Sequence, residues 1–273
     1  MKRIEVLMLL FLMSISVTYA QDEFKQSLSG VKYVKIEMDA KIKLVAGGSS
    51  ELVIAENKGD DDKYDYDYDY DTDEDKKRKT EKMEGMKAIY AGGVDNTGFG
   101  LSVEKDGDVL KVRDLKSWMQ RGSVVITLPK NMNVILDCGN LGHATVEGFS
   151  SEVEVNTNVG HITLDDVTGP ITAHTSTGAI TVKFANVNQS SPISISSSTG
   201  DVDVALPSST NANLELRSSM GTIYTDFDLE IPREDGMKRI GAIRKIESKL
   251  NSGGVKISLR SSTGNVYLRK AKN

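Results

Sequence analysis

Two histidines in the second half of the chain are spaced so that their imidazoles could share a metal ion. His143 and His161 each follow a glycine, and 18 residues separate them. Asp201 and Asn265 follow later glycines and could add oxygen ligands. Zinc sites ordinarily hold three or four protein ligands, however, and the chain has only three histidines and one cysteine. We therefore predict no metal site, and we treat these four residues and Asp203 as candidate contact residues that point outward.

Pairs of carboxylates could support a second kind of chemistry, since two carboxylates can hydrolyse a glycosidic bond. Asp165 and Asp166 are adjacent, and Asp201 and Asp203 are two residues apart. No groove of basic or aromatic residues is evident around either pair in the sequence. The chain also lacks the G-x-S-x-G, H-E-x-x-H and phosphate-loop motifs. We predict no catalytic residue, no enzyme activity and no cofactor.

An insert in the first half, residues 57–87, alternates tyrosine with aspartate. The alternating residues are Tyr64, Asp65, Tyr66, Asp67, Tyr68, Asp69, Tyr70 and Asp71. In an extended segment the carboxylates would lie on one face about 6.8 Å apart, and the tyrosines on the other face could stack on sugars or on a partner. Segments with blocks of like charge are usually disordered, however. We predict a disordered insert, with a recognition segment as the alternative.

The candidate histidines and carboxylates take their positions from a repeat. Each copy has a glycine and then apolar residues two and four positions later, as in Gly160-His161-Ile162-Thr163-Leu164. The glycines are Gly142, Gly160, Gly178, Gly200, Gly221 and Gly264. The first four intervals between them are 18, 18, 22 and 21 residues long, and the last is 43. The last interval therefore contains two periods or one long insertion.

A second short strand precedes each glycine after the first, with apolar residues seven and five positions before it. Val153-Glu154-Val155 is one example. Alternation with a period of two places these residues and those after the glycine on one buried face. Strands this short cannot bury a face alone, but stacked periods can close a continuous core. We predict an all-β solenoid over residues 131–273, with a β-sandwich as the alternative. We expect glycine at each turn because the backbone there needs a positive φ or approaches another segment closely.

Residues from about 124 to the end resemble the bacterial putative-adhesin family of exported β-strand-repeat domains. The resemblance rests on Val125-Ile126-Thr127-Leu128-Pro129-Lys130, on the glycine-centred strand pairs, and on the closing stretch around Ser262-Thr263-Gly264-Asn265. It implies a right-handed parallel β-helix in a protein of the cell envelope. It implies no catalytic residue, because the function of the family is mostly unassigned.

The first half of the chain has a less regular pattern. Short alternating runs cover residues 31–56, 101–112 and 124–128, with Asp106-Gly107-Asp108 as a hairpin turn. We predict an irregular N-terminal β region over residues 21–130 that begins the same sheet. Near the other end, residues 233–249 are rich in Lys and Arg, and they fit a helix or a twisted hairpin. This segment could cover an open end of the solenoid or bind anionic envelope polymers.

The N-terminus has the pattern of a secretory signal peptide. Lys2 and Arg3 precede an apolar run from Val6 to Val17, and Ala20 suits signal peptidase. The run is shorter than the about 20 residues of a membrane-spanning helix. We predict a signal peptide over residues 1–20 and no membrane span after its cleavage. With no cysteine near that junction, we expect no lipid anchor; Cys138, the one cysteine, is expected to be buried.

Charge narrows the choice of partner. The formal net charge is −5, whereas nucleic-acid binding needs a basic face. We therefore predict that the protein has no nucleic-acid partner. We predict an exported protein of the periplasm or cell surface that binds an envelope polymer or protein, or that serves as a structural module there. The alternative is a periplasmic accessory protein that senses or regulates envelope stress. The oligomeric state and the ligand do not follow from the sequence.

Overall fold

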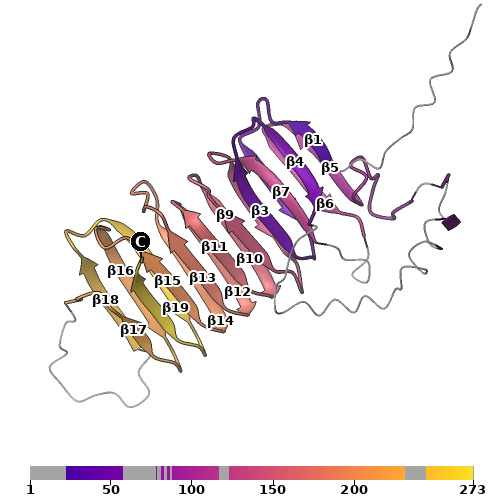
Figure 1. The fold of residues 1–273 in the computed structure, drawn as a ribbon. Coiled ribbons are helices and arrows are strands. Elements are labelled where there is room, and N and C mark those ends of the chain that lie inside the picture. Colours follow the sequence, from indigo (N-terminus) through magenta and orange to yellow (C-terminus); the bar gives the residue numbers. More distant parts are fainter. Residues whose placement is uncertain are drawn as a thin grey trace, which may run out of the picture.

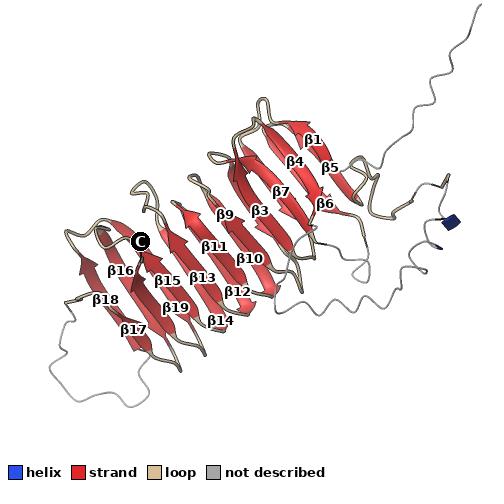
Figure 2. Ribbon diagram, in the orientation of Figure 1, coloured by secondary structure: helices blue, strands red, loops and turns tan. Residues whose placement is uncertain are grey.

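The chain folds into two ten-stranded β-sheets, seen in a computed structural model that describes residues 23–57, 78, 81–82, 85–86, 88–116, 123–230 and 244–272 (Figures 1 and 2). The strands are β1 (Glu23–Ser27), β2 (Tyr33–Glu37), β3 (Ile42–Gly47), β4 (Glu51–Glu56), β5 (Leu101–Asp106), β6 (Val109–Asp114), β7 (Val124–Pro129), β8 (Asn133–Asp137), β9 (Ala144–Glu147), β10 (Val153–Val159), β11 (Ile162–Val167), β12 (Ile171–Thr177), β13 (Ile180–Phe184), β14 (Ile193–Thr199), β15 (Val202–Leu206), β16 (Ala212–Ser218), β17 (Ile223–Thr225), β18 (Arg244–Leu250), β19 (Val255–Ser261) and β20 (Val266–Lys270). Every regular element over residues 23–57, 88–116, 123–230 and 244–272 is a strand, so the prediction of an all-β fold is confirmed.

Each repeat forms one rung, which has a strand in each sheet. We call the sheet that contains β11 sheet A and the sheet that contains β10 sheet B. The rung β10–β11 begins in sheet B, turns at Gly160 and continues in sheet A. Val153 and Val155 of β10 and Ile162 and Leu164 of β11 are buried in the common core, as the alternation predicts. β10 pairs in parallel with β8 and β12, and β11 with β9 and β13, so the rungs are joined along both sheets.

The corner glycines form a column in which neighbouring backbones touch. A Cβ atom on Gly160 would overlap the carbonyl oxygen of Gly142, and the same holds for each later corner glycine and its neighbour in the stack. The Gly142 oxygen also accepts a hydrogen bond of 2.9 Å from the buried Thr157 hydroxyl. Four further hydroxyls repeat this bond, those of Thr175, Ser197, Ser218 and Ser261. Close approach therefore explains the repeated glycine.

Rungs at both ends stack in an order that differs from the sequence. In sheet A the order is β1-β4-β7-β3-β9-β11-β13-β15-β20-β17, and in sheet B it is β18-β16-β19-β14-β12-β10-β8-β2-β6-β5. The last rung of the chain, β19–β20, thus lies between β14–β15 and β16–β17. Likewise β2–β3 lies between β6–β7 and β8–β9. The 43-residue interval after Gly221 contains one insertion, which includes β18, rather than two periods.

The N-terminal region is more regular than predicted, because it supplies the two rungs β2–β3 and β6–β7 as well as the antiparallel strands β1, β4 and β5. Ala40 stands at the corner of β2–β3, where its carbonyl oxygen lies against Gly142. The rung therefore lacks the glycine by which the later rungs are recognised. Both sheets continue across the predicted boundary near residue 130.

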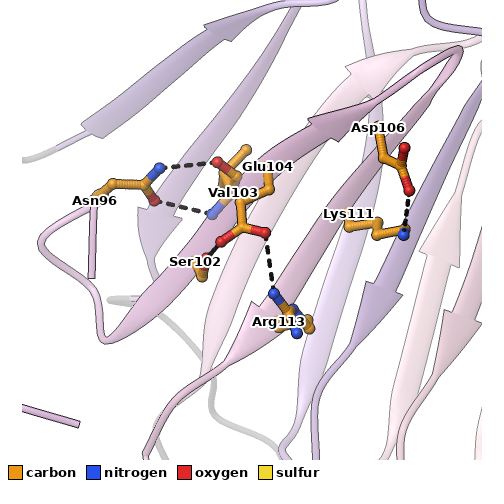
Figure 3. Close-up of polar contacts among 7 residues, drawn as sticks. All are labelled: Asn96, Ser102, Val103, Glu104, Asp106, Lys111 and Arg113. Carbon is orange, nitrogen blue, oxygen red and sulfur yellow. Dashed lines mark hydrogen bonds and ion pairs between the residues drawn. The ribbon is translucent and has the colours of Figure 1, made fainter. Parts of the chain in front are cut away.

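The two ends of sheet B differ, since a side chain caps the outermost strand at one end and an added antiparallel strand forms the other. At one end, the Asn96 amide makes two hydrogen bonds to the Val103 backbone of the outermost strand, β5, with lengths of 2.8 and 2.9 Å (Figure 3). Glu104 of β5 also forms an ion pair with Arg113 of β6. At the other end, β18 pairs antiparallel with β16. Residues 233–243 of the basic segment lie outside the described residues, and residues 244–250 are a strand and not a helix. This strand covers the edge of β16 and is itself the outermost strand.

Cys138 is fully buried, as expected from the sequence. Burial, with the carboxylates of Asp137 and Asp39 nearby, raises the pKa of its thiol to about 12. Since the thiolate is the reactive form, we expect no reaction with Ellman's reagent in the native protein at pH 8. In guanidinium chloride one thiol per chain should react. Rapid labelling of the native chain would contradict the buried position.

Candidate binding face

His143 and His161 lie one above the other on neighbouring rungs, as predicted, but each imidazole bonds to the backbone. Their ring centroids are 5.5 Å apart, with 29° between the planes. The His161 N–H donates to His143 Nδ1, and the Ala179 N–H donates to His161 Nδ1, both at 3.1 Å. Burial, His161 and the Lys41 charge lower the pKa of His143. The pair therefore links three successive corners, because the Nδ1 atom of each imidazole accepts a backbone N–H of the next corner.

Asp201 and Asn265 continue the same column further along the stack. Asp201 Oδ1 accepts the Asn265 N–H at 2.7 Å, and Asn265 Oδ1 accepts the Thr222 N–H at 2.9 Å. Each of the four predicted residues that follow a corner glycine thus bonds to the backbone of the next rung. Among the residues that the structure describes, no group of three His, Cys, Asp or Glu side chains is placed to hold a metal ion.

The fifth predicted residue, Asp203, belongs to a cluster on the outward face of sheet A. Its carboxylate accepts two hydrogen bonds from Arg269, of 2.8 and 2.7 Å. The Arg269 guanidinium carbon lies 5.2 Å from the ring centroid of Tyr267. Tyr267 stacks on Tyr224, with centroids 5.2 Å apart and 11° between the rings. The Asn265 amide donates to the Tyr267 hydroxyl at 3.1 Å.

We call Asp203, Tyr224, Asn265, Tyr267 and Arg269 the tyrosine face. Asp203, Tyr267 and Tyr224 are direct partners across β15, β20 and β17, so their side chains point the same way. Tyr224 lies on the last strand of sheet A and is 50% exposed. The cluster thus offers one open aromatic ring that is supported by a second ring and an arginine–aspartate pair.

Sequence reasoning found Asp203 and Asn265 but missed the two tyrosines and Arg269. All three were visible in the repeat, as the second or fourth residue of a strand, yet nothing in the sequence indicated that β20 lies between β15 and β17. In sequence order, Tyr224 would stack on Asp203. The exchanged rung order is what brings Asp203 next to Arg269, 66 positions later in the chain, and what leaves Tyr224 on the outermost strand of the sheet.

A comparison with protein-family models identifies a family for this chain. The family model described as Toastrack DUF4097 matches residues 82–269, which is more than half of the chain. The chain belongs to the Toastrack DUF4097 family. The resemblance to β-strand-repeat domains of unknown function is thereby confirmed.

Two solved structures are similar to this Toastrack protein. One is a putative cell adhesion protein from Clostridium sporogenes, with 8% identity, a TM-score of 0.46, and coverage of 91% of this chain and 99% of that one. The other is a putative adhesin from Bacteroides fragilis, with 12% identity, a TM-score of 0.35, and coverage of 91% and 96%. The comparison with curated proteins found no match.

Two other predicted features fall largely or wholly outside the described residues. The predicted signal peptide, residues 1–20, lies outside the described residues, and so do the alternating tyrosines and aspartates of residues 64–71. Within the ranges that the structure does describe, no helix has the length and apolar character to cross a membrane.

Proposed function

We propose that this Toastrack protein is an exported, non-catalytic binding module of the cell envelope and that the tyrosine face contacts its partner. The observation that carries the proposal is the exposed Tyr224 ring stacked on Tyr267. Tyrosine provides a large contact area at a low cost in conformational entropy, and it is enriched among the residues that dominate binding energy. Because both rings stand on paired strands, the face is held in place before binding.

The signal-peptide pattern of the first 20 residues supports export. The connections between strands support a handedness for the solenoid. Parallel neighbours such as β10 and β12 are joined through β11 in the other sheet. Crossovers between parallel strands are right-handed in about 98% of cases. We therefore propose the right-handed winding that the family resemblance implies.

Binding is tested with residues 21–273 and a sedimented envelope fraction from the organism that makes the protein. We expect Tyr224→Ala to weaken retention about tenfold, as for a residue worth about 1.4 kcal/mol of binding. Tyr33→Ala is the matched control, because Tyr33 is a partly buried tyrosine on β2 of the other sheet. Equal retention of the Tyr224 variant and the wild type, or an equal loss in the control, would contradict the proposal.

Location is tested by protease treatment of intact cells that carry an epitope tag after Asn273. Loss of the tag on intact cells supports contact at the cell surface. Protection until the outer membrane is permeabilised would contradict surface contact and favour a periplasmic partner. Retention of the tag in the cytoplasmic fraction would contradict export itself.

A further inference from the structure

The outward face of sheet B carries a cluster of cations at its C-terminal end, on the adjacent strands β19, β16 and β18. We call Arg217, Lys245, Lys249, Lys256 and Arg260 the cation grid. Arg260, Arg217 and Lys245 are direct partners across the three strands and form one row. Lys256 and Lys249 flank Asn213 in a second row, four residues away along each strand. The grid thus presents five cations in fixed register.

A carboxylate between the two rows holds part of the grid in position. Glu215 is 9% exposed and accepts Lys256 at 2.8 Å and Arg260 at 2.6 Å. These two hydrogen-bonded cations lower the pKa of Glu215, so it stays ionised and keeps both side chains fixed. The Arg260 Nε–H also donates to Ser258 at 3.1 Å. A preorganised cation loses less entropy when it binds a ligand.

The remaining cations exceed the acidic groups available to them. Lys245 forms an exposed ion pair with Glu247, whereas Arg217 forms no ion pair with any residue that the structure describes. Counting Glu215 and Glu247 against the five cations leaves a charge of +3, or +2 if Glu230 beside them is included, in a chain whose net charge is −5. This face is therefore a local positive region on an acidic protein.

A hollow of about 870 Å³ opens beside Glu215, and its charged lining combines Lys249 and Lys256 with Glu215, Glu230 and Glu247, so the positive charge of the grid lies along the strand rows rather than in the hollow. Across β14 and β12 the same face continues with hydroxyl groups, those of Ser194, Ser196 and Thr172, which are partners or lie two residues apart in register. Cations and hydroxyls thus follow one another along one flat surface.

We infer that the cation grid binds a linear anionic glycan, a polymer of sugars that carry carboxylates. Neighbouring cations in the row are about 4.8 Å apart, the spacing of strands in a sheet, so three span about 10 Å. Guanidinium groups bind carboxylates in a bidentate manner, and the serine and threonine hydroxyls can bond to sugar hydroxyls. That the glycan belongs to the cell envelope rests on the proposed function. That the cation grid binds carboxylates does not depend on the proposed function.

The test uses residues 21–273, immobilised for interferometry, with alginate as the carboxylate-bearing polymer and dextran as the neutral one. We expect binding of alginate that weakens as salt is raised, since exposed charges are screened. Arg217→Gln should weaken alginate binding about fivefold, and the double variant Arg217→Gln/Lys245→Gln at least about tenfold, because two charge-assisted contacts are then removed. The matched control is Lys183→Gln, which removes an exposed cation from sheet A. Circular dichroism of each variant establishes that it is folded.

Several results would overturn the inference. They are equal binding of dextran and alginate, unchanged alginate binding in the double variant, or an equal loss in Lys183→Gln. Binding to phosphatidylglycerol vesicles with no binding to alginate would assign the grid to a membrane surface instead. Tyr224→Ala serves to separate the two proposals. It should leave alginate binding unchanged, so a failure of the tyrosine face in the envelope assay and a failure of the grid are seen independently.

Discussion

A Gly160→Ala protein is expected to be less stable than the wild type by about 3 kcal/mol or more, the cost of forcing an atom into a packed interior. The added Cβ would overlap the Gly142 carbonyl oxygen, which belongs to the backbone and cannot rotate away. Separating the two corners would also stretch the buried bond from Thr157 to the same oxygen. Because the φ of Gly160 lies outside the left-handed region, the effect is steric rather than conformational.

Thermal unfolding followed by circular dichroism measures this loss, and a decrease in Tm of about 6–12 °C corresponds to it for a chain of this size. Gly48→Ala is the matched control. Its φ is also outside the left-handed region, but nothing lies within 4 Å of the added Cβ. The control should change stability by no more than about 1 kcal/mol. Similar Tm values for the two variants would show that the corners are not in contact.

The periodic part of the fold could be predicted because period-two alternation and a recurring glycine are both local signals. Val153, Val155, Ile162 and Leu164 are buried as the pattern requires. The pattern does not reveal the buried hydroxyl between them, at Thr157 and its equivalents. Since threonine is common on exposed strand positions, only the structure shows that this hydroxyl bonds to the corner of the next rung.

The order of the rungs could not be predicted, because every rung presents the same apolar face to its neighbours. Val266 of β20 pairs equally well in register with Val202 of β15 and with Ile223 of β17. Which strands lie beside β20 is decided by pairing between segments far apart in the chain, and the pattern of a single sequence does not indicate that pairing. For the same reason the tyrosine face and the cation grid, which both need the exchanged order, were not found from the sequence, although Asp203 and Asn265 were.

Removing the last rung, residues 251–273, is expected to expose β16, β17 and β18 together, although all three lie earlier in the chain. β19 and β20 are inserted between them and the rest of the stack. The deletion also removes the fully buried side chains Ile257, Leu259, Val266 and Leu268. Each such burial is worth about 1.5–3 kcal/mol, so the outermost rung loses its support as well as its hydrogen-bonded neighbours.

Hydrogen exchange measured by mass spectrometry should show peptides within residues 212–225 and 244–250 exchanging freely in this truncated protein, while peptides from β10–β13 stay protected. A protein shortened only by Lys272 and Asn273, which lie beyond β20, is the control and should match the wild type. In a solenoid stacked in sequence order, the deletion would remove an end rung and leave β16 paired. Retained protection of β16 would therefore contradict the exchanged order or show that β16–β17 can move onto β14–β15.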